Sequence, residues 1–337
     1  MVGVPDYEAR ALDLLPPEVV DYYAGGSGRE QTLRDNPAAW SRVRLRPRAL
    51  RDVSRVDTAT TVLGTPVAAP VLVAPMAFQG LVHADADRAT ALGAARAGTL
   101  LTVSTRSSLP VEDIGADPWW FQVYVMRDRD LTARLAARAA AAGARALVLT
   151  ADTPVVARKH RNDRAGAVSE EHFLAALGPG ADAASAEQAA DITFDEVARL
   201  RRDWGLPVVV KGVLRADDAR AAVEAGAAAV LVSNHGGRQL DGAVATADCL
   251  REVVAAVDGR AEVYVDGGVR TGTDVLRALA MGARAVLLGR PVLWALAVDG
   301  ADGVHAVLSG LADDLAHTMA LAGAPTVADV TTDLLAP

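Results

Sequence analysis

The 337-residue sequence has a single cysteine, and aromatic residues make up only 4% of it. One cysteine, Cys249, excludes an internal disulfide and any metal site built from several cysteines. We expect Cys249 to be a buried, small apolar residue. Hydrophobic residues, mainly Ala and Val, nevertheless reach 51% of the chain. The chain can therefore bury a large core through close packing of small side chains.

The sequence also lacks any block of Lys and Arg, and its formal net charge is −8. This charge balance argues against a nucleic-acid partner, which would need a basic surface. No stretch of about 20 apolar residues occurs, so no membrane span is predicted. Residues 1–10 carry early acids in place of an apolar run, which predicts no signal peptide. We therefore expect a soluble, cytoplasmic protein with no membrane partner.

A repeated pattern of helix followed by strand runs through most of the chain. An Ala-rich helical segment ends in glycine, and a β-branched run follows within a few residues. The clearest copies contain Gly143, Gly226 and Gly282, and a weaker one contains Gly98. Glycine at such a position takes the left-handed conformation that ends a helix. The apolar runs lack alternation, which is typical of parallel strands buried on both faces.

Eight runs of this kind predict eight parallel strands. They are residues 70–75, 99–103, 119–124, 145–150, 207–211, 228–233, 262–266 and 285–289. Eight strands alternating with helices favour an α/β fold of the (β/α)₈ TIM-barrel type. A doubly wound open sheet is the alternative. It is disfavoured because no G-x-G-x-x-G motif follows the first strand.

Two segments stand apart from this repeat within what we expect to be one domain, residues 1–337. Residues 1–65 form an N-terminal extension with a short helix ending near the D-Y-Y-A-G-G stretch. Residues 165–190 form an insertion after the fourth strand, where barrel insertions commonly act as active-site lids. A disordered surface loop is the equal alternative for that insertion. Residues 299–323 are predicted to form one amphipathic helix.

The most informative segment follows the sixth strand, where the sequence is V-S-N-H-G-G-R-Q-L-D-G (232–242). In a (β/α)₈ barrel, catalytic residues gather at the C-terminal ends of the strands. His235 can accept a proton near neutral pH. Arg238 can bind a carboxylate through two parallel hydrogen bonds. The alternative for His235 is a histidine satisfied by local hydrogen bonds, but its polar neighbours favour the catalytic interpretation.

Glycine-rich turns follow strands seven and eight, at 265–272 and 287–291, and they carry Arg270 and Arg290. The loops after these two strands are where barrels commonly bind phosphate. Lys211, after strand five, is predicted to face the barrel mouth and hold negative charge on a reduced cofactor ring. A solvated strand-end lysine is the alternative.

Asp152, after strand four, is predicted to orient a protonated imidazole, with a turn-forming aspartate as the alternative. Gln122 and Tyr124 share one face of strand three.

The strand-end residues indicate a phosphate-bearing cofactor with an electron-accepting ring, because they combine a phosphate site, a lysine, a carboxylate-binding arginine and a base. Flavin mononucleotide (FMN) is the simplest candidate. No metal-ligand spacing occurs in the set, so no metal site is predicted.

The motif S-N-H-G-G-R-Q-L-D-G closely resembles the FMN-dependent 2-hydroxy acid oxidase and dehydrogenase family, which includes glycolate oxidase, lactate oxidase and mandelate dehydrogenase. The similarity extends from D-Y-Y-A-G-G near the start to L-G-R-P near the end, and includes D-G-G-V-R at 266–270. The resemblance implies FMN-dependent oxidation of a small 2-hydroxy acid to the 2-oxo acid. The flavin would then be reoxidised by oxygen or another acceptor, and the protein would form a homotetramer.

The resemblance also implies roles for individual residues. His235 would be the base, paired with Asp152, and Tyr22, Tyr124 and Arg238 would bind substrate. The residues implied to contact the cofactor are Pro75, Met76, Ala77, Thr102, Gln122, Thr150, Lys211, Ser233, Asp266, Gly267, Gly268, Val269, Arg270, Gly289 and Arg290.

One position departs from the family pattern. The family places a second carboxylate-binding arginine seven residues after the strand-four aspartate, and this chain has Lys159 there. Lysine keeps the charge but loses the two-pronged hydrogen bonding. Arg158 is the alternative if the loop is shifted by one residue. Two other functions stay open from the sequence: an FMN barrel with isomerase-like activity, and a flavin-binding protein that has lost catalysis.

Overall fold

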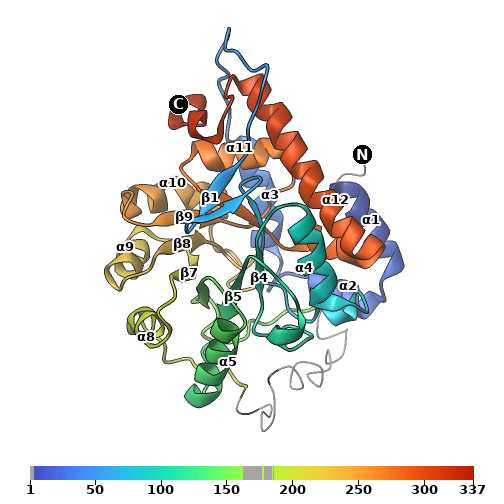
Figure 1. The fold of residues 1–337 in the computed structure, drawn as a ribbon, viewed down its shortest axis with the longest axis vertical. Helices are drawn as coiled ribbons and strands as arrows, with labels where there is room; N and C mark the ends of the chain where they lie inside the picture. Colours follow the sequence, from blue (N-terminus) through green and yellow to red (C-terminus); the bar gives the residue numbers. More distant parts are fainter. Residues whose placement is uncertain (1–3, 162–176, 178–183, 185) are drawn as a thin grey trace.

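A closed barrel of eight parallel strands forms the centre of the computed structural model, which describes residues 4–161, 177, 184 and 186–337 (Figure 1). The strands follow one another around the barrel in sequence order, and β10 closes it against β3. Each strand lies within or next to a predicted run, so the TIM-barrel prediction is confirmed and the open sheet is wrong. The strands are β3 (Val71–Val73), β4 (Leu101–Val103), β5 (Trp119–Val123), β6 (Leu147–Thr150), β7 (Val208–Val213), β8 (Ala229–Val232), β9 (Glu262–Val265) and β10 (Ala285–Leu288).

Helices surround the barrel, as the repeat predicts (Figure 1). They are α4 (Ala86–Arg96), α5 (Arg129–Ala141), α8 (Asp195–Trp204), α9 (Ala216–Glu224), α10 (Thr246–Val257), α11 (Gly272–Ala280) and α12 (Arg290–Ala322). The glycines that end four of the repeats, at 98, 143, 226 and 282, have φ values of 64°, 91°, 95° and 100°. These are left-handed values, as the sequence pattern predicts.

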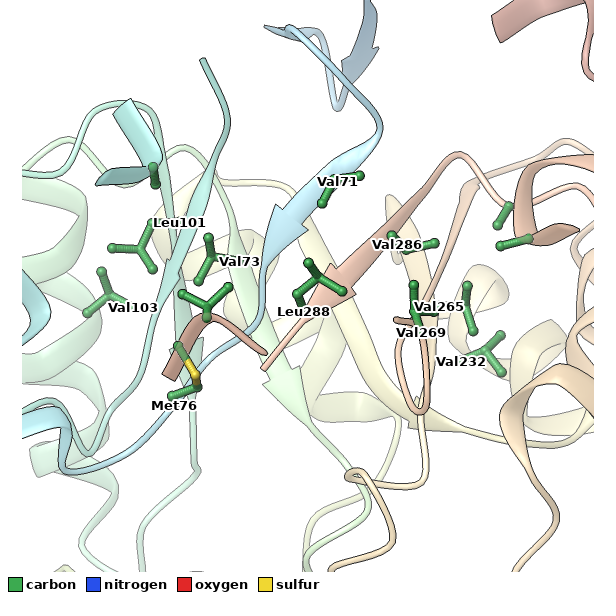
Figure 2. Close-up of a cluster of buried hydrophobic side chains, with 14 of the residues drawn as sticks. Val71, Val73, Met76, Leu101, Val103, Val232, Val265, Val269, Val286 and Leu288 are labelled. Atoms are coloured by element: carbon green, nitrogen blue, oxygen red, sulfur yellow. The ribbon is translucent and has the colours of Figure 1, made fainter. Parts of the chain in front are cut away.

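The strand side chains are buried on both faces of the sheet. Figure 2 shows Val71 and Val73 of β3 near Leu288 of β10, on the side of the barrel that packs against the helices. The residue between the two valines, Leu72, belongs to a second cluster that fills the barrel interior. Alternate residues of one strand therefore enter two different apolar layers. This explains why the sequence runs show no alternation of apolar and polar residues.

The N-terminal extension contains more structure than the sequence predicts. The expected short helix is α2 (Pro17–Ala24), but α1 (Val4–Leu14), α3 (Gln31–Arg42) and a hairpin of β1 (Thr60–Val62) and β2 (Thr65–Val67) also form. The hairpin strands have three residues each, which is too short for a periodic pattern to be recognised. Val62 and Val67 pack onto the interior cluster of the barrel.

Most of the predicted lid, residues 165–190, lies outside the described residues. Of its last residues, Ala189 donates a backbone hydrogen bond to Val125, and Gln188 bridges to Met126. The end of the insertion is therefore attached to the segment that follows β5.

The predicted C-terminal helix, residues 299–323, is confirmed as the second of two helices that join end to end in α12. Helix α12 begins at Arg290, directly after β10, and its backbone leaves the helical conformation at Asp299 and Gly300. Among the described residues, α12 is the one helix long and apolar enough to cross a membrane. However, 61% of its most apolar stretch is buried within the protein, as in a core helix. Cys249 is buried, as predicted.

Four single-turn 3₁₀ helices complete the described structure: Gln79–Leu81, Val111–Asp113, Val327–Asp329 and Thr332–Leu334.

Candidate active site

A cavity lies at the C-terminal end of the barrel, among the loops that leave the strands. Its space, including solvent at the open mouth, is about 1310 Å³. Most of the site residues predicted from the sequence line it: Tyr22, Pro75, Met76, Ala77, Gln122, Tyr124, Thr150, Lys159, Lys211, His235, Arg238, Asp266, Gly267, Val269, Arg270, Gly289 and Arg290.

Four predicted site residues do not belong to the lining. Asp152 and Ser233 lie directly behind it, hydrogen-bonded to His235 and Lys211 respectively. Thr102 is fully buried in the barrel wall. Gly268 faces away towards α3, because a Cβ there would lie 2.5 Å from the carbonyl carbon of Asn36. A side chain at position 268 would thus collide with α3, which gives this glycine a packing role.

His235 is held in a fixed orientation by two hydrogen bonds. Its backbone lies in the left-handed region, with φ of 58°, and its N–H donates to Ser233 Oγ at 3.1 Å. Its Nδ1 lies 2.9 Å from Asp152 Oδ1. Gly212 allows this contact, because a Cβ there would meet Asp152 Cβ at 2.5 Å. The predicted His235–Asp152 pair is therefore present in the structure.

The charges around this pair set its protonation. Burial alone would raise the pKa of Asp152, but the Lys211 ammonium and His235 outweigh it and hold that pKa well below its ordinary value. Burial and the like charge of Lys211 lower the pKa of His235, and Asp152 only partly offsets them. At neutral pH the pair is thus a carboxylate beside a neutral imidazole.

Lys211 is only 4% exposed, so the solvated-lysine alternative is wrong. Its Nζ donates to Ser233 Oγ at 3.0 Å and lies 3.8 Å from Asp266 Oδ2 and 3.9 Å from Asp152 Oδ2. Burial would lower the pKa of Lys211, but the Asp152 and Asp266 carboxylates raise it above its ordinary value. A permanent positive charge therefore sits at the end of β7.

Three buried polar atoms at this end of the barrel have no hydrogen-bond partner among the described residues: Thr102 Oγ1, Asp152 Oδ2 and Asp266 Oδ1. Buried polar groups are normally hydrogen-bonded, so such atoms point to a missing ligand. Next to them, the Gln122 amide is fixed because its Nε2 donates to Thr150 Oγ1 at 2.9 Å. Together these groups offer hydrogen-bonding positions that suit the polar edge of a flavin ring.

The residues after β9 and β10 have the chemistry of a phosphate site. Arg290 is held by carbonyl oxygens, donating from Nε to Tyr23 at 2.8 Å and from Nη1 to Gly236 at 3.0 Å. Burial and the like charges of Arg238 and Arg270 lower the pKa of Arg290 to about 9. A bound anion would offset the repulsion between these buried guanidinium groups. The N-terminus of α12, which lies next to them, also favours an anion. The described residues therefore fit FMN at both its ring and its phosphate.

The remaining polar side chains lie in the outer part of the cavity. The Arg238 guanidinium stacks over Tyr22, 5.2 Å from the ring centroid, and donates from Nη1 to the carbonyl oxygens of Tyr22 at 2.6 Å and Gly25 at 2.9 Å. Burial raises the pKa of Tyr22 and of Tyr124, so both phenols stay protonated and can donate hydrogen bonds. An arginine and two phenols suit a substrate carboxylate and hydroxyl.

Lys159 and Arg158 lie in different positions relative to the cavity. Lys159 lines the cavity, whereas Arg158 does not and accepts a backbone hydrogen bond from Gly28 at 3.2 Å. Burial and the nearby Arg238 and Arg106 guanidinium groups lower the pKa of Lys159 to about 8. Lys159, and not Arg158, thus lines the cavity, and its role in binding a carboxylate stays a prediction.

Sequence reasoning missed Tyr23, Arg106 and Gln188, which also line the cavity. Tyr23 donates its hydroxyl to the carbonyl oxygens of Ala77 and Phe78 at 2.9 and 2.7 Å, and so fixes the loop after β3. Arg106 follows β4 in the stretch T-V-S-T-R. Its place in a loop after a strand end was the available signal, because that is where the other site residues were found.

The fold and the site together define an α/β-barrel enzyme that holds a phosphate-bearing redox cofactor beside a histidine base. Comparison with known proteins agrees with this class. The family model described as FMN-dependent dehydrogenase matches residues 11–337. The chain is 47% identical to an L-lactate oxidase from Nostoc sp., over 99% of this chain and 98% of that one. It is 45% identical to a 4-hydroxymandelate oxidase from Amycolatopsis orientalis, over 97% and 96% of the two chains.

A solved structure of mandelate oxidase superposes with a TM-score of 0.93 at 45% identity, covering 100% of this chain and 98% of that chain. The chain belongs to the FMN-dependent dehydrogenase family, and its cofactor is FMN.

Proposed function

We propose that this protein oxidises a small 2-hydroxy acid to the 2-oxo acid, with His235 as the base and oxygen as the acceptor that regenerates the cofactor. The observation that carries the proposal is the His235–Asp152 pair, 2.9 Å apart, at the wall of the cavity. The relatives named above support the reaction class, because each is named as an oxidase of a 2-hydroxy acid.

His235 is suited to take the hydroxyl proton of the substrate. Its Nδ1–H donates to the Asp152 carboxylate, which leaves Nε2 unprotonated and able to accept a proton. Once His235 is protonated, the charge of Asp152 stabilises the imidazolium. FMN, when bound, supplies the two-electron oxidant for the carbon that carries the hydroxyl group. The same residues serve if His235 instead takes the proton from that carbon.

Arg238, Tyr22, Tyr124 and Lys159 would hold the substrate. Arg238 is fixed by three carbonyl oxygens, so little freedom is lost when it binds a carboxylate. Lys211 would stabilise negative charge on the cofactor. The cofactor would be bound by the polar side-chain atoms of Thr102, Gln122, Thr150, Ser233 and Asp266. The loop from Pro75 to Ala77 would bind it through the backbone, and Arg270, Gly289 and Arg290 would take the phosphate.

The two alternatives are less well supported. An isomerase-like activity has no counterpart among the relatives named above. The non-catalytic alternative depended on Lys159 being unable to serve, but Lys159 lines the cavity. The homotetramer and the cytoplasmic location stay predictions.

The test is to incubate the FMN-loaded protein in air with lactate, glycolate and mandelate and to measure 2-oxo acid and hydrogen peroxide. We expect both products in a ratio of one to one from at least one acid. Product formed only with an added quinone or dye would overturn oxygen as the acceptor. No 2-oxo acid from any substrate under either condition would contradict the reaction itself.

A further inference from the structure

Two buried asparagines connect helix α3 to the turn that carries His235. Asn36 is 2% exposed, and Asn234, which directly precedes His235 in the sequence, is 4% exposed. Asn36 Nδ2 donates to Asn234 Oδ1 at 2.9 Å, and Asn234 Nδ2 donates to Asn36 Oδ1 at 2.7 Å. Neither side chain lines the cavity, so any part that this pair plays in the reaction is indirect.

Two further contacts of Asn234 fix the orientation of both amide groups. Its Oδ1 accepts a hydrogen bond from Gly237 N–H at 3.1 Å, and its Nδ2 donates to the carbonyl oxygen of Val244 at 3.1 Å. The amide oxygen and nitrogen of Asn234 therefore cannot exchange places. Asn36 must in turn present a donor to that oxygen and an acceptor to that nitrogen, which a carboxamide does.

His235 lies within the turn that Asn234 and Gly237 close. Gly237 N–H donates to the backbone oxygen of Asn234 at 3.1 Å as well as to its Oδ1. Between these two residues, His235 has a φ of 58°. This is a left-handed value, which a residue other than glycine keeps only where its surroundings hold it. The orientation of the imidazole towards Asp152 therefore depends on how firmly the turn is held.

Helix α3 packs closely against this turn and against the turn after β9. A Cβ at Gly237 would lie 2.6 Å from the backbone nitrogen of Leu33, so the turn after β8 touches the backbone of the helix. Trp40 Nε1 donates to the carbonyl oxygen of Gly267, after β9, at 2.8 Å. Asn36 lies between these two contacts along the helix. It therefore forms its hydrogen bonds to the His235 turn from a rigid support.

We propose that Asn36 is a positioning residue for the reaction: its amide pair with Asn234 holds the turn that keeps His235 against Asp152. This inference rests on the proposed function, in which His235 is the base. Without the Asn36 amide, one N–H of Asn234 has no acceptor in a buried place, which favours a shift of the turn. A shift of about 1 Å in a catalytic group can lower the rate about 100-fold.

The experiment compares Asn36→Ala with the wild type, both loaded with FMN, by following flavin bleaching without oxygen. The substrate is whichever of lactate, glycolate and mandelate bleaches the wild type fastest. We expect the limiting rate at saturating substrate to fall about 10–100-fold. The Kd of the substrate should change by less than about threefold, because Arg238 is held by other carbonyl oxygens. Asn36→Ser replaces Asn36→Ala if the alanine variant does not fold.

The matched control is Thr32→Val, which removes another buried hydrogen bond between the same helix and the same loop. Thr32 is fully buried, and its Oγ1 donates to the carbonyl oxygen of Ala243 at 3.0 Å. Urea unfolding should show a loss of stability in Thr32→Val similar to that in Asn36→Ala. The limiting rate of bleaching in Thr32→Val should nevertheless stay at the wild-type value.

Two further measurements separate positioning from a general loss of stability. Amide hydrogen exchange of the peptide that covers residues 233–238 should be faster in Asn36→Ala and unchanged in Thr32→Val. The second measurement combines Asn36→Ala with Asn234→Ala. Because the two amides act as one unit, adding Asn36→Ala to Asn234→Ala should lower the limiting rate by less than about threefold.

A limiting rate in the Asn36 variant no lower than in Thr32→Val, or effects of the two alanine substitutions that multiply, overturns the inference and leaves the proposed function standing. Failure of both Asn36→Ala and Asn36→Ser to fold would show a purely structural role, and also overturns it. Failure of lactate, glycolate and mandelate to bleach the wild type contradicts the proposed function, and the inference with it.

Discussion

The two ends of the barrel share one apolar interior, but their carboxylates differ in how fully they are hydrogen-bonded. At the N-terminal end, the β1–β2 hairpin closes the barrel, and the Glu262 carboxylate accepts hydrogen bonds from Leu63 N–H and from the Tyr264 hydroxyl. At the C-terminal end, Thr102, Asp152 and Asp266 each leave a buried oxygen without a hydrogen-bond partner among the described residues. The N-terminal end of the barrel therefore contributes to stability, whereas the C-terminal end is arranged to bind a ligand at some cost in stability.

The largest expected effect comes from His235 at the C-terminal end. We expect His235→Ala to reduce the rate of flavin reduction by roughly 10²–10⁴-fold, because general-base catalysis is lost. FMN should stay bound, since the phosphate and ring positions do not include this side chain. Stopped-flow reduction without oxygen measures the rate, and the visible spectrum measures bound FMN. A near-normal rate in this variant would refute the role of His235.

At the N-terminal end, the corresponding test is Glu262→Ala, which should affect stability alone. It leaves the Leu63 N–H and the Tyr264 hydroxyl without their acceptor, and each unsatisfied buried group costs about 1–3 kcal/mol. Urea unfolding of the FMN-loaded protein measures the change in the free energy of unfolding. KM and kcat should stay at their wild-type values.

The control for that variant is Glu224→Ala, which removes an exposed glutamate at the end of α9 and should leave stability nearly unchanged. If Glu262→Ala raised KM as well as lowering the free energy of unfolding, the distinction between the two ends of the barrel would not hold.

A smaller effect is expected at Lys159, which we place in substrate binding. Lys159→Met should raise KM about tenfold, because one charge-assisted contact to the substrate is lost. It should raise KM more than Lys211→Met does, since Lys211 lies against Asp152 and Asp266, deeper in the barrel. Steady-state kinetics of both variants provide the comparison. Equal KM in wild type and Lys159→Met would remove this lysine from the site.

The smallest effect is a shift in the pH profile. His235 must be neutral to act as a base, so kcat/KM falls as the pH drops through its pKa. Burial and the charge of Lys211 lower that pKa, which places the acid limb below the ordinary value of about 6.5. Asp152→Asn removes the carboxylate that favours the protonated form, so the acid limb should move to still lower pH. An acid limb that moves to higher pH in this variant would contradict the assigned pairing.

Much of the fold could be predicted because parallel strands buried on both faces leave a continuous β-branched run, and the helix before each run ends at a left-handed glycine. Strand-end motifs likewise located His235, Arg238 and Lys211, because the barrel brings all strand ends to one face. The hairpin strands, with three residues each, leave no such local pattern.

Arg106 carried one signal, its place in a loop after a strand end, but that signal does not show that its side chain reaches the cavity. Its position depends on contacts between loops, such as that from Ser108 to Asp87, which are distant in sequence. The same holds for Lys159 and Arg158, because their adjacent positions in the sequence do not show which side chain lines the cavity.

The central claim is that the C-terminal end of the barrel places a 2-hydroxy acid, a histidine base and FMN together. The most direct measurement is to add 2-hydroxy acids, aliphatic, aromatic and dicarboxylic, to the FMN-loaded protein without oxygen while following the yellow flavin absorbance. We predict that at least one acid bleaches it and that the His235→Ala variant bleaches far more slowly. A protein that binds FMN but keeps its full colour with every acid, or one that refuses FMN altogether, would contradict the account.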